Sequence, residues 1–175
     1  MNKIILYAKG KDRSGIISEI SEIINKFNGN IEITKMIKLE SHFNILALIQ
    51  IQKDKINKLE NKLNQITNLY IEINETKKLE EDTNRLFYFR LKGADNEGIV
   101  HIFTNYLYKQ NINILDLESE ITNAPVTGHQ LFLLKSKLLL PNKIDAKIIK
   151  NELIRLSNIN NVVIKFEKFN NSMDY

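Results

Sequence analysis

Apolar residues alternate with polar ones in several short segments, a spacing of two that is typical of half-buried β-strands. The clearest alternation runs through Phe43, Ile45, Ala47 and Ile49. Other short segments are rich in β-branched and aromatic residues, and these also predict strands. They are residues 4–8, 31–33, 70–73, 86–91, 112–114, 131–140 and 162–166.

Between these segments, apolar residues recur every three or four positions, which predicts amphipathic helices. The stripes are Ile16, Ile17, Ile20, Ile23, Ile24 and Phe27; Ile56, Leu59, Leu63 and Ile66; Ile99, Val100, Phe103, Tyr106 and Leu107; and Ala146, Ile149, Leu153 and Leu156. The order of predicted elements is therefore βαββαβ, followed by the same order again.

An internal repeat underlies this order, because the two halves align without a gap at a shift of 83 residues from the first strand into the second. The residues in step are Gly10 and Gly93, Asp12 and Asp95, Gly15 and Gly98, Asn28 and Asn111, Asn30 and Asn113, and Ile31 and Ile114. Among the helical positions, only Phe27 meets a polar residue, Gln110. At the last helix the shift is 90, so the second half carries extra residues between its helices.

The βαββαβ order predicts an α+β fold. Right-handed crossovers place both helices of each half on one face of a four-stranded antiparallel sheet. We expect domains at residues 1–76 and 85–168, a linker at 77–84 and a polar tail at 169–175. Such small modules leave a sheet face and an edge open, which favours self-association, most simply as a homodimer.

Composition narrows the classes of protein. Hydrophobic residues make up 43% of 175 residues and there is no cysteine, which excludes disulfides and thiolate metal sites. No apolar run is long enough for a signal-peptide core or a membrane helix, so we expect a soluble, cytoplasmic protein. The net charge of +4 comes from lysines scattered among glutamates, and direct nucleic-acid binding is not expected.

The candidate chemistry lies in the turn from the first strand to the first helix of each half. A helix start exposes unpaired N–H groups with partial positive charge, and glycine lets a carboxylate approach them. The candidate ligand-binding residues are Asp12, Arg13, Ser14, Gly15, Ile16 and Asn30 in the first half, and Asp95, Asn96, Glu97, Gly98, Ile99 and Asn113 in the second. Asp12 and Asp95 could instead cap the helices, and an ordinary capped helix start remains the structural alternative.

Asn30 and Asn113 precede apolar strand segments, and we expect their amides beside the helix start, where they suit the charged ends of an amino acid. The alternative is that asparagine forms the turn from helix to strand. Glu97 brings a negative charge to the second turn, so the first turn is the better candidate.

The motif around Asp12-Arg13-Ser14-Gly15-Ile16, followed by a helix and Gly29-Asn30-Ile31, resembles the ACT domain family. The tandem arrangement resembles the glycine-cleavage-system transcriptional repressor and its relatives, and residues 124–128 before the strand at Leu131 are a further similarity. The resemblance implies ferredoxin-like domains, ligand binding at the strand-to-helix loops and regulation through partner contacts. Ser14 replaces the family's proline in the first motif, and Asn96-Glu97 replaces arginine-proline in the second.

Nothing in the sequence predicts an enzyme, a cofactor or a metal site. His42, His101 and His129 lack metal-ligand spacing, and no phosphate-binding or nucleophile motif is present. Three functions remain open. They are an amino-acid-sensing regulator that acts on a protein partner such as a transcription factor, an accessory subunit of a separate metabolic enzyme, and a ligand-free assembly scaffold. Glycine and serine are the ligands to test first.

Overall fold

The computed structural model describes residues 1–77, 85–94, 96–123, 128 and 130–169. In the first half, the elements run β1 (Asn2–Lys11), α1 (Ile16–Lys26), β2 (Asn30–Leu39), β3 (His42–Ile51), a 3-10 turn (Lys53–Lys55), α2 (Ile56–Leu63) and β4 (Leu69–Thr76). The four strands form one antiparallel sheet in the order β2-β3-β1-β4.

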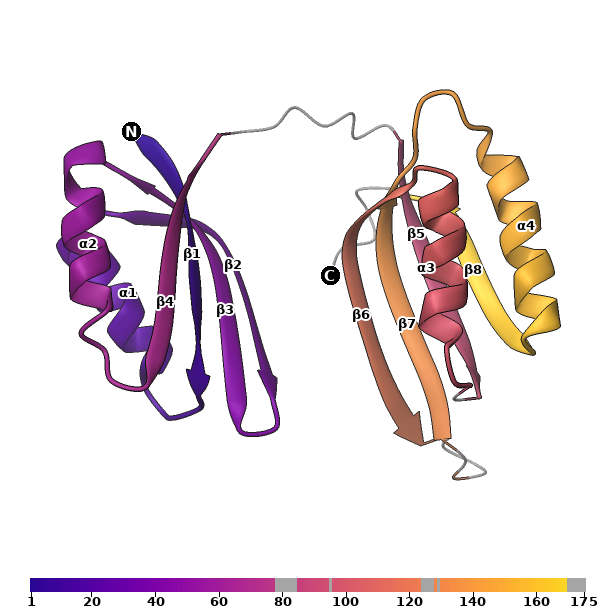
Figure 1. Ribbon diagram of the computed structural model, residues 1–175, viewed down its shortest axis with the longest axis horizontal. Coiled ribbons are helices and arrows are strands. Elements are labelled where there is room, and N and C mark those ends of the chain that lie inside the picture. The colour runs from indigo at the N-terminus through magenta and orange to yellow at the C-terminus, as the bar shows by residue number, and fades with distance from the viewer. Residues whose placement is uncertain (78–84, 95, 124–127, 129, 170–175) are drawn as a thin grey trace. The chain divides into compact units, whose positions relative to one another are not determined.

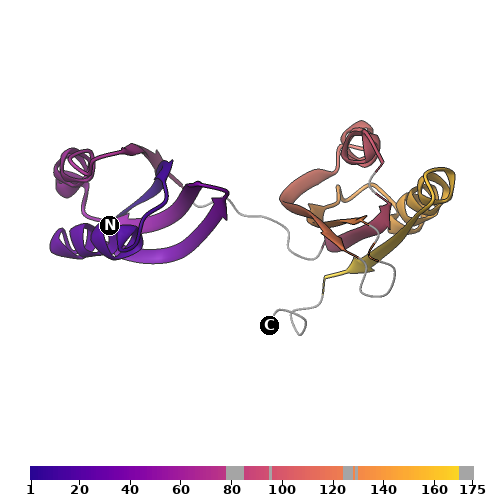
Figure 2. The ribbon, with the colours of Figure 1, turned by 90° about the horizontal axis from the view of Figure 1, so that it is seen from below.

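The second half repeats this plan. Its elements are β5 (Leu86–Ala94), α3 (Ile99–Lys109), β6 (Asn113–Asn123), β7 (Gln130–Leu139), α4 (Ala146–Ile159) and β8 (Val162–Lys168). The sheet order is β6-β7-β5-β8, and both helices lie on one side of it, as they do in the first half (Figures 1 and 2). The predicted fold of two ferredoxin-like βαββαβ units is confirmed.

The chain divides into two compact units, Met1–Leu79 and Glu80–Tyr175. Residues 78–84 and 170–175, which make up most of the predicted linker and tail, lie outside the described residues. The finer boundaries at 76, 84 and 168 therefore stay a prediction. None of the helices that the structure describes is long and apolar enough to cross a membrane.

Each core forms between one sheet face and its two helices. In the first domain, alternate residues of β1 and β3 are buried against the apolar stripes of α1 and α2, as the spacing predicted. The second domain fills the same layer with more aromatic side chains. Phe89 packs against Phe103 with ring centroids 5.5 Å apart, and Phe87 stacks on Phe166 at 4.9 Å.

The strand register locates the extra residues of the second half. The offset is 83 at Gly10 and Gly93, and it is 89 at their strand partners Phe43 and Phe132. Most of the insertion therefore lies in the connection from β6 to β7, which contains residues 124–128. Of these, only Gly128 is described, with φ of 69°. Even the irregularities repeat, because a break in register falls between residues 31 and 33 and again between residues 114 and 116.

The helix-free faces of the two sheets differ in chemistry. The free face of the first domain carries large apolar side chains, namely Ile5, Tyr7, Ile33, Ile37, Leu46 and Leu48. Ile33 is 59% exposed and Ile37 is 52% exposed. On the second domain, Asp116 and Glu118 face Lys137 and Lys135 across the ladder, so charged pairs occupy the corresponding surface.

Candidate ligand site at the strand-to-helix turn

The turn between β1 and α1 depends on Gly15. This residue is the N-cap of α1 and has φ of 86° and ψ of −2°, a left-handed conformation that glycine adopts without steric cost. A Cβ built at Gly15 would have no other heavy atom within 4 Å, so the approach to the turn is open. Gly98 repeats this geometry before α3, with φ of 77° and an equally open surrounding.

Among the described residues, no side chain caps α1. Because the first N–H groups of a helix have no intrahelical partner, they need side chains, water or a ligand. The backbone N–H groups of Ser14, Gly15 and Ile16 form no hydrogen bond with any residue that the structure describes. These three donors, with the positive end of the helix dipole, can receive a small anionic group.

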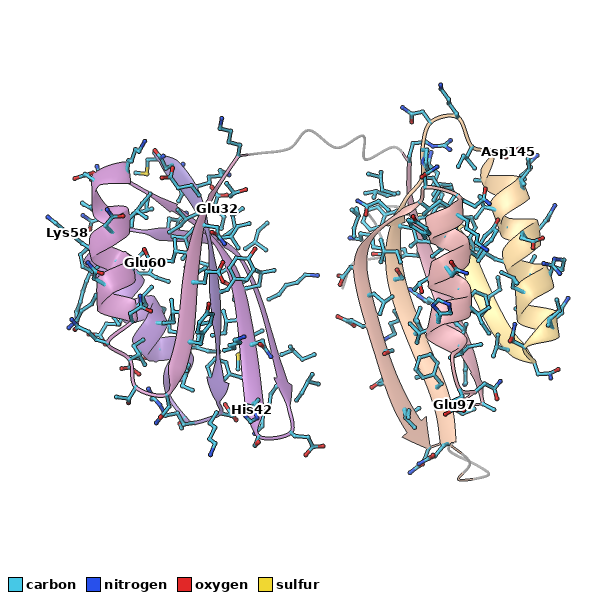
Figure 3. The ribbon with its side chains drawn as sticks, in the orientation of Figure 1. Glu32, His42, Lys58, Glu60, Glu97 and Asp145 are labelled. Carbon is cyan, nitrogen blue, oxygen red and sulfur yellow. The ribbon has the colours of Figure 1, made fainter. Side chains whose placement is uncertain are left out.

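The second turn is more closed. The N–H of Ile99 donates to the carbonyl of Asn96 at 3.2 Å, and the side-chain amide of Asn96 donates to the carbonyl of Asn160 at 3.1 Å. Figure 3 places Glu97 at the start of α3, where its carboxylate adds negative charge. Asp95 lies outside the described residues. The first turn therefore offers more free donors than the described part of the second.

Asp12 does not cap α1. Its backbone N–H donates to the carbonyl of Ser41 at 2.9 Å, and its carboxylate pairs with Nζ of Lys38 at 2.7 Å. Both partners belong to the β2–β3 hairpin, so Asp12 ties the turn to that hairpin. The alternative that Asp12 caps the helix is wrong, because its carboxylate is directed to the hairpin and Gly15 occupies the N-cap.

Arg13 forms an ion pair with Glu19, in the first turn of the same helix. The two side chains are 45% and 40% exposed, so the pair lies at the surface. Ser14 does not cap α1, because Gly15 occupies the N-cap position.

Asn30 and Asn113 do not lie beside these turns. Asn30 pairs with Gln50, which pairs in turn with Lys3, whereas the turn follows the opposite end of β1. In Figure 3, Glu32 of β2 and His42 at the start of β3 mark these two ends of the sheet. Asn113 likewise pairs with Leu139, which pairs in turn with Leu86 at the start of β5. The prediction that these amides lie beside the helix start was wrong. Each helix runs antiparallel to the strand before it, so the residue after the helix lies at the opposite end of the sheet from the turn.

Four other asparagines, which follow the helices, have a conformational role. Asn28 and Asn111 follow α1 and α3 with φ of 55° and 53°, the left-handed position at which helices commonly end. Asn68 and Asn161 adopt the same conformation after α2 and α4, with φ of 64° and 52°. Asparagine tolerates this region better than most residues. The helix-to-strand turns are therefore formed by Asn28 and Asn111, not by Asn30 and Asn113, which begin β2 and β6.

The sequence interpretation missed the surroundings of the first turn. Ser41 and His42 of the hairpin and Asn68 of the α2–β4 connection lie at the same end of the sheet, as Figure 1 shows for the connections themselves. The signal was available in the βαββαβ order, because antiparallel pairing brings these connections together. Within the described residues, no group of three or more His, Asp or Glu side chains could hold a metal ion, and His129 lies outside them.

A family model for the ACT domain matches residues 2–73, the span from β1 into β4. The first domain is an ACT domain. The second domain has the same strand order and helix placement, and it is ACT-like in fold.

Two crystal structures match the chain over almost its whole length. A protein of unknown function from Galdieria sulphuraria is 24% identical with a TM-score of 0.86, and the match covers 97% of this chain and 99% of that one. A proposed glycine cleavage system transcriptional repressor is 18% identical with a TM-score of 0.69, covering 97% and 98%. At these identities the likeness shows the fold. A comparison with curated proteins found no match.

Proposed function

We propose that this protein is an amino-acid-responsive regulator that binds a small amino acid at the β1–α1 turn of its ACT domain. The observation that carries the proposal is the set of N–H groups of Ser14, Gly15 and Ile16, which have no partner among the described residues and stand in an open approach. A ligand carboxylate would accept from these groups. The ligand ammonium would meet Asp12, whose carboxylate is 26% exposed beside Lys38.

The bound ligand would act through contacts with other chains. ACT family membership of the first domain and the fold shared with a proposed glycine cleavage repressor support a regulatory role in transcriptional or metabolic control. We propose a cytoplasmic, non-enzymatic protein that signals through a protein partner and does not bind nucleic acid directly. An accessory subunit of a metabolic enzyme would use the same site, and a native co-purification separates the two by the partner it recovers.

The test is thermal unfolding in the presence of each of the twenty amino acids. Ligand that binds only the folded state stabilises it by about 2.7 kcal/mol at a hundredfold excess over its dissociation constant, which raises the melting temperature by several degrees. We expect glycine or serine to give this shift in the native chain.

Gly15→Val and Gly98→Val form a matched pair. Both glycines have left-handed φ and open surroundings, so both substitutions impose the same backbone strain. Gly15→Val should abolish the ligand-induced shift, whereas Gly98→Val should retain it. An absence of any melting shift in the native chain would favour the ligand-free scaffold. A ligand-induced shift of equal size in both variants would show that the ligand binds in another part of the protein.

A further inference from the structure

A surface pocket, called the hollow below, lies in the first domain on the helix-free face at the end of β1. It has a volume of about 570 Å³ and is lined by Lys9, Gly10, Lys11, His42, Phe43, Asn44, Asn68 and Tyr70. Lys9 and Lys11 alternate with the buried Ala8, so both lysines stand on the helix-free face. Across the ladders, Lys11 faces His42, and Lys9 faces Asn44 and Tyr70.

The hollow is basic, and none of the residues that line it is acidic. Nζ of Lys9 lies 4.8 Å from the centroid of the Tyr70 ring, and neither Lys9 nor Lys11 forms an ion pair with a residue that the structure describes. The nearby carboxylate of Asp12 is paired with Lys38. Lysines two residues apart on a strand stand about 7 Å apart, so their charges repel each other until an anion lies between them.

The second domain provides an internal comparison, because the register aligns each position of the hollow. Lys92 corresponds to Lys9, but Ala94, Leu131, Leu133 and Val163 replace Lys11, His42, Asn44 and Tyr70. The same fold is therefore built with small or apolar residues at these positions. Folding therefore does not require Lys11, His42, Asn44 or Tyr70, whereas Lys92 and Asn161 keep the lysine and asparagine found at positions 9 and 68.

We propose that this hollow binds the anionic group of a small molecule, either a phosphate or a carboxylate. The two ammonium groups would hold the anionic oxygens, and His42, Asn44 and Asn68 offer polar contacts to the neighbouring atoms of the ligand. The site differs from the β1–α1 turn, where backbone N–H groups hold the ligand, and it does not depend on that proposal. A chain with both sites would respond to two metabolites.

The experiment is calorimetric titration of the full chain, at about 0.15 M salt, with inorganic phosphate, pyrophosphate and succinate as separate probes. The double substitution Lys9→Gln and Lys11→Gln removes both ammonium groups. Lys92→Gln with Lys135→Gln is the matched control, because it lowers the net charge equally on the free face of the second domain. We expect the first variant to lose at least tenfold in affinity and the control to bind as the native chain does.

Stronger binding of the phosphates than of succinate would identify a phosphorylated ligand, and the reverse order would identify a carboxylate. Gly15→Val should leave this titration unchanged, which separates the hollow from the turn. Failure of the native chain to bind any of the three probes at millimolar concentration would overturn the proposal. An equal loss in the control pair would overturn it as well, because the binding would then be a response to net charge alone.

Discussion

The two pairs of glycines that align between the halves have different structural roles. Gly15 and Gly98 adopt left-handed φ with free space around them, whereas Gly10 and Gly93 lie where strands approach closely. A Cβ at Gly10 would stand 2.3 Å from the carbonyl oxygen of Asn68, and one at Gly93 would stand 2.4 Å from Cγ1 of Val162. Backbone conformation therefore requires glycine at positions 15 and 98, and close strand packing requires it at positions 10 and 93.

Substitution by alanine separates these roles. We expect Gly15→Ala and Gly98→Ala each to lower the free energy of unfolding by roughly 1–2 kcal/mol, the cost of left-handed φ in an L-residue. Gly10→Ala should cost more, on the order of 3 kcal/mol, because the obstructing atom is backbone and β4 must shift. Urea denaturation of the three variants measures the order. A cost for Gly10→Ala below that of Gly15→Ala would show that β4 moves aside easily.

Among the elements, the described α-helices differ in how the backbone N–H groups of their first turns are satisfied. No side chain that the structure describes caps α1, α2 or α3, whereas Oδ1 of Asp145 accepts from the backbone N–H of Lys147 at 2.8 Å and caps α4. Figure 3 shows Asp145 at the start of this helix. Arg85 supports the preceding connection by donating to the carbonyl of Pro141 at 2.8 Å and also to that of Ile144.

Asp145→Ala should therefore lower the stability of the second domain by about 1 kcal/mol, the usual cost of losing an N-cap. Lys55→Ala, at the N-cap of α2, is the control, because its side chain makes no capping bond and its removal should change stability little. Differential scanning calorimetry resolves the effect as a lower melting temperature. Equal melting of the two variants would mean that water replaces the Asp145 cap without loss.

The sequence predicted the elements well because hydrophobic spacing is local information. The stripes of α1 and α2 and the alternation of β3 were all visible along the chain, and their buried residues form the core. The site was predicted less well, because its surroundings depend on strand order. Asn30 belongs to the same repeated motif as the turn, but it lies at the far end of the sheet. Ser41, in the β2–β3 hairpin, accepts a hydrogen bond from the backbone N–H of Asp12 in the turn. Motif spacing carries no information about such distances.

At the scale of the whole molecule, the two domains share a fold but present unlike free surfaces. Four strands of about ten residues give a face of roughly 600 Å². An association that leaves the basic hollow at Lys9 and Lys11 open uses the apolar part of such a face and falls at the low end of interface sizes. The apolar face of the first domain suits this association better than the charged face of the second. We therefore propose that a homodimer forms through the first domain.

Light scattering of the native chain should give about twice the chain mass of 20.4 kDa. Ile37→Glu with Leu46→Glu should produce monomers, because both side chains are exposed on the apolar face and the new charges would repel across the interface. Lys135→Glu, on the free face of the second domain, is the control and should remain dimeric. A native chain that stays monomeric at micromolar concentration would contradict the proposal.

The repeated break in register has a consequence for growth into fibres. Strands β2 and β6 are sheet edges, and each offers unpaired backbone groups to any extended chain. An incoming strand that pairs along residues 33–39 of β2 or 116–123 of β6 loses its register at the break that precedes them, where an additional residue interrupts the ladder. Lys35 and Lys38 place charges on the remaining length of β2. On these two edges, although not on β4 or β8, the break limits the length over which another chain can add a strand.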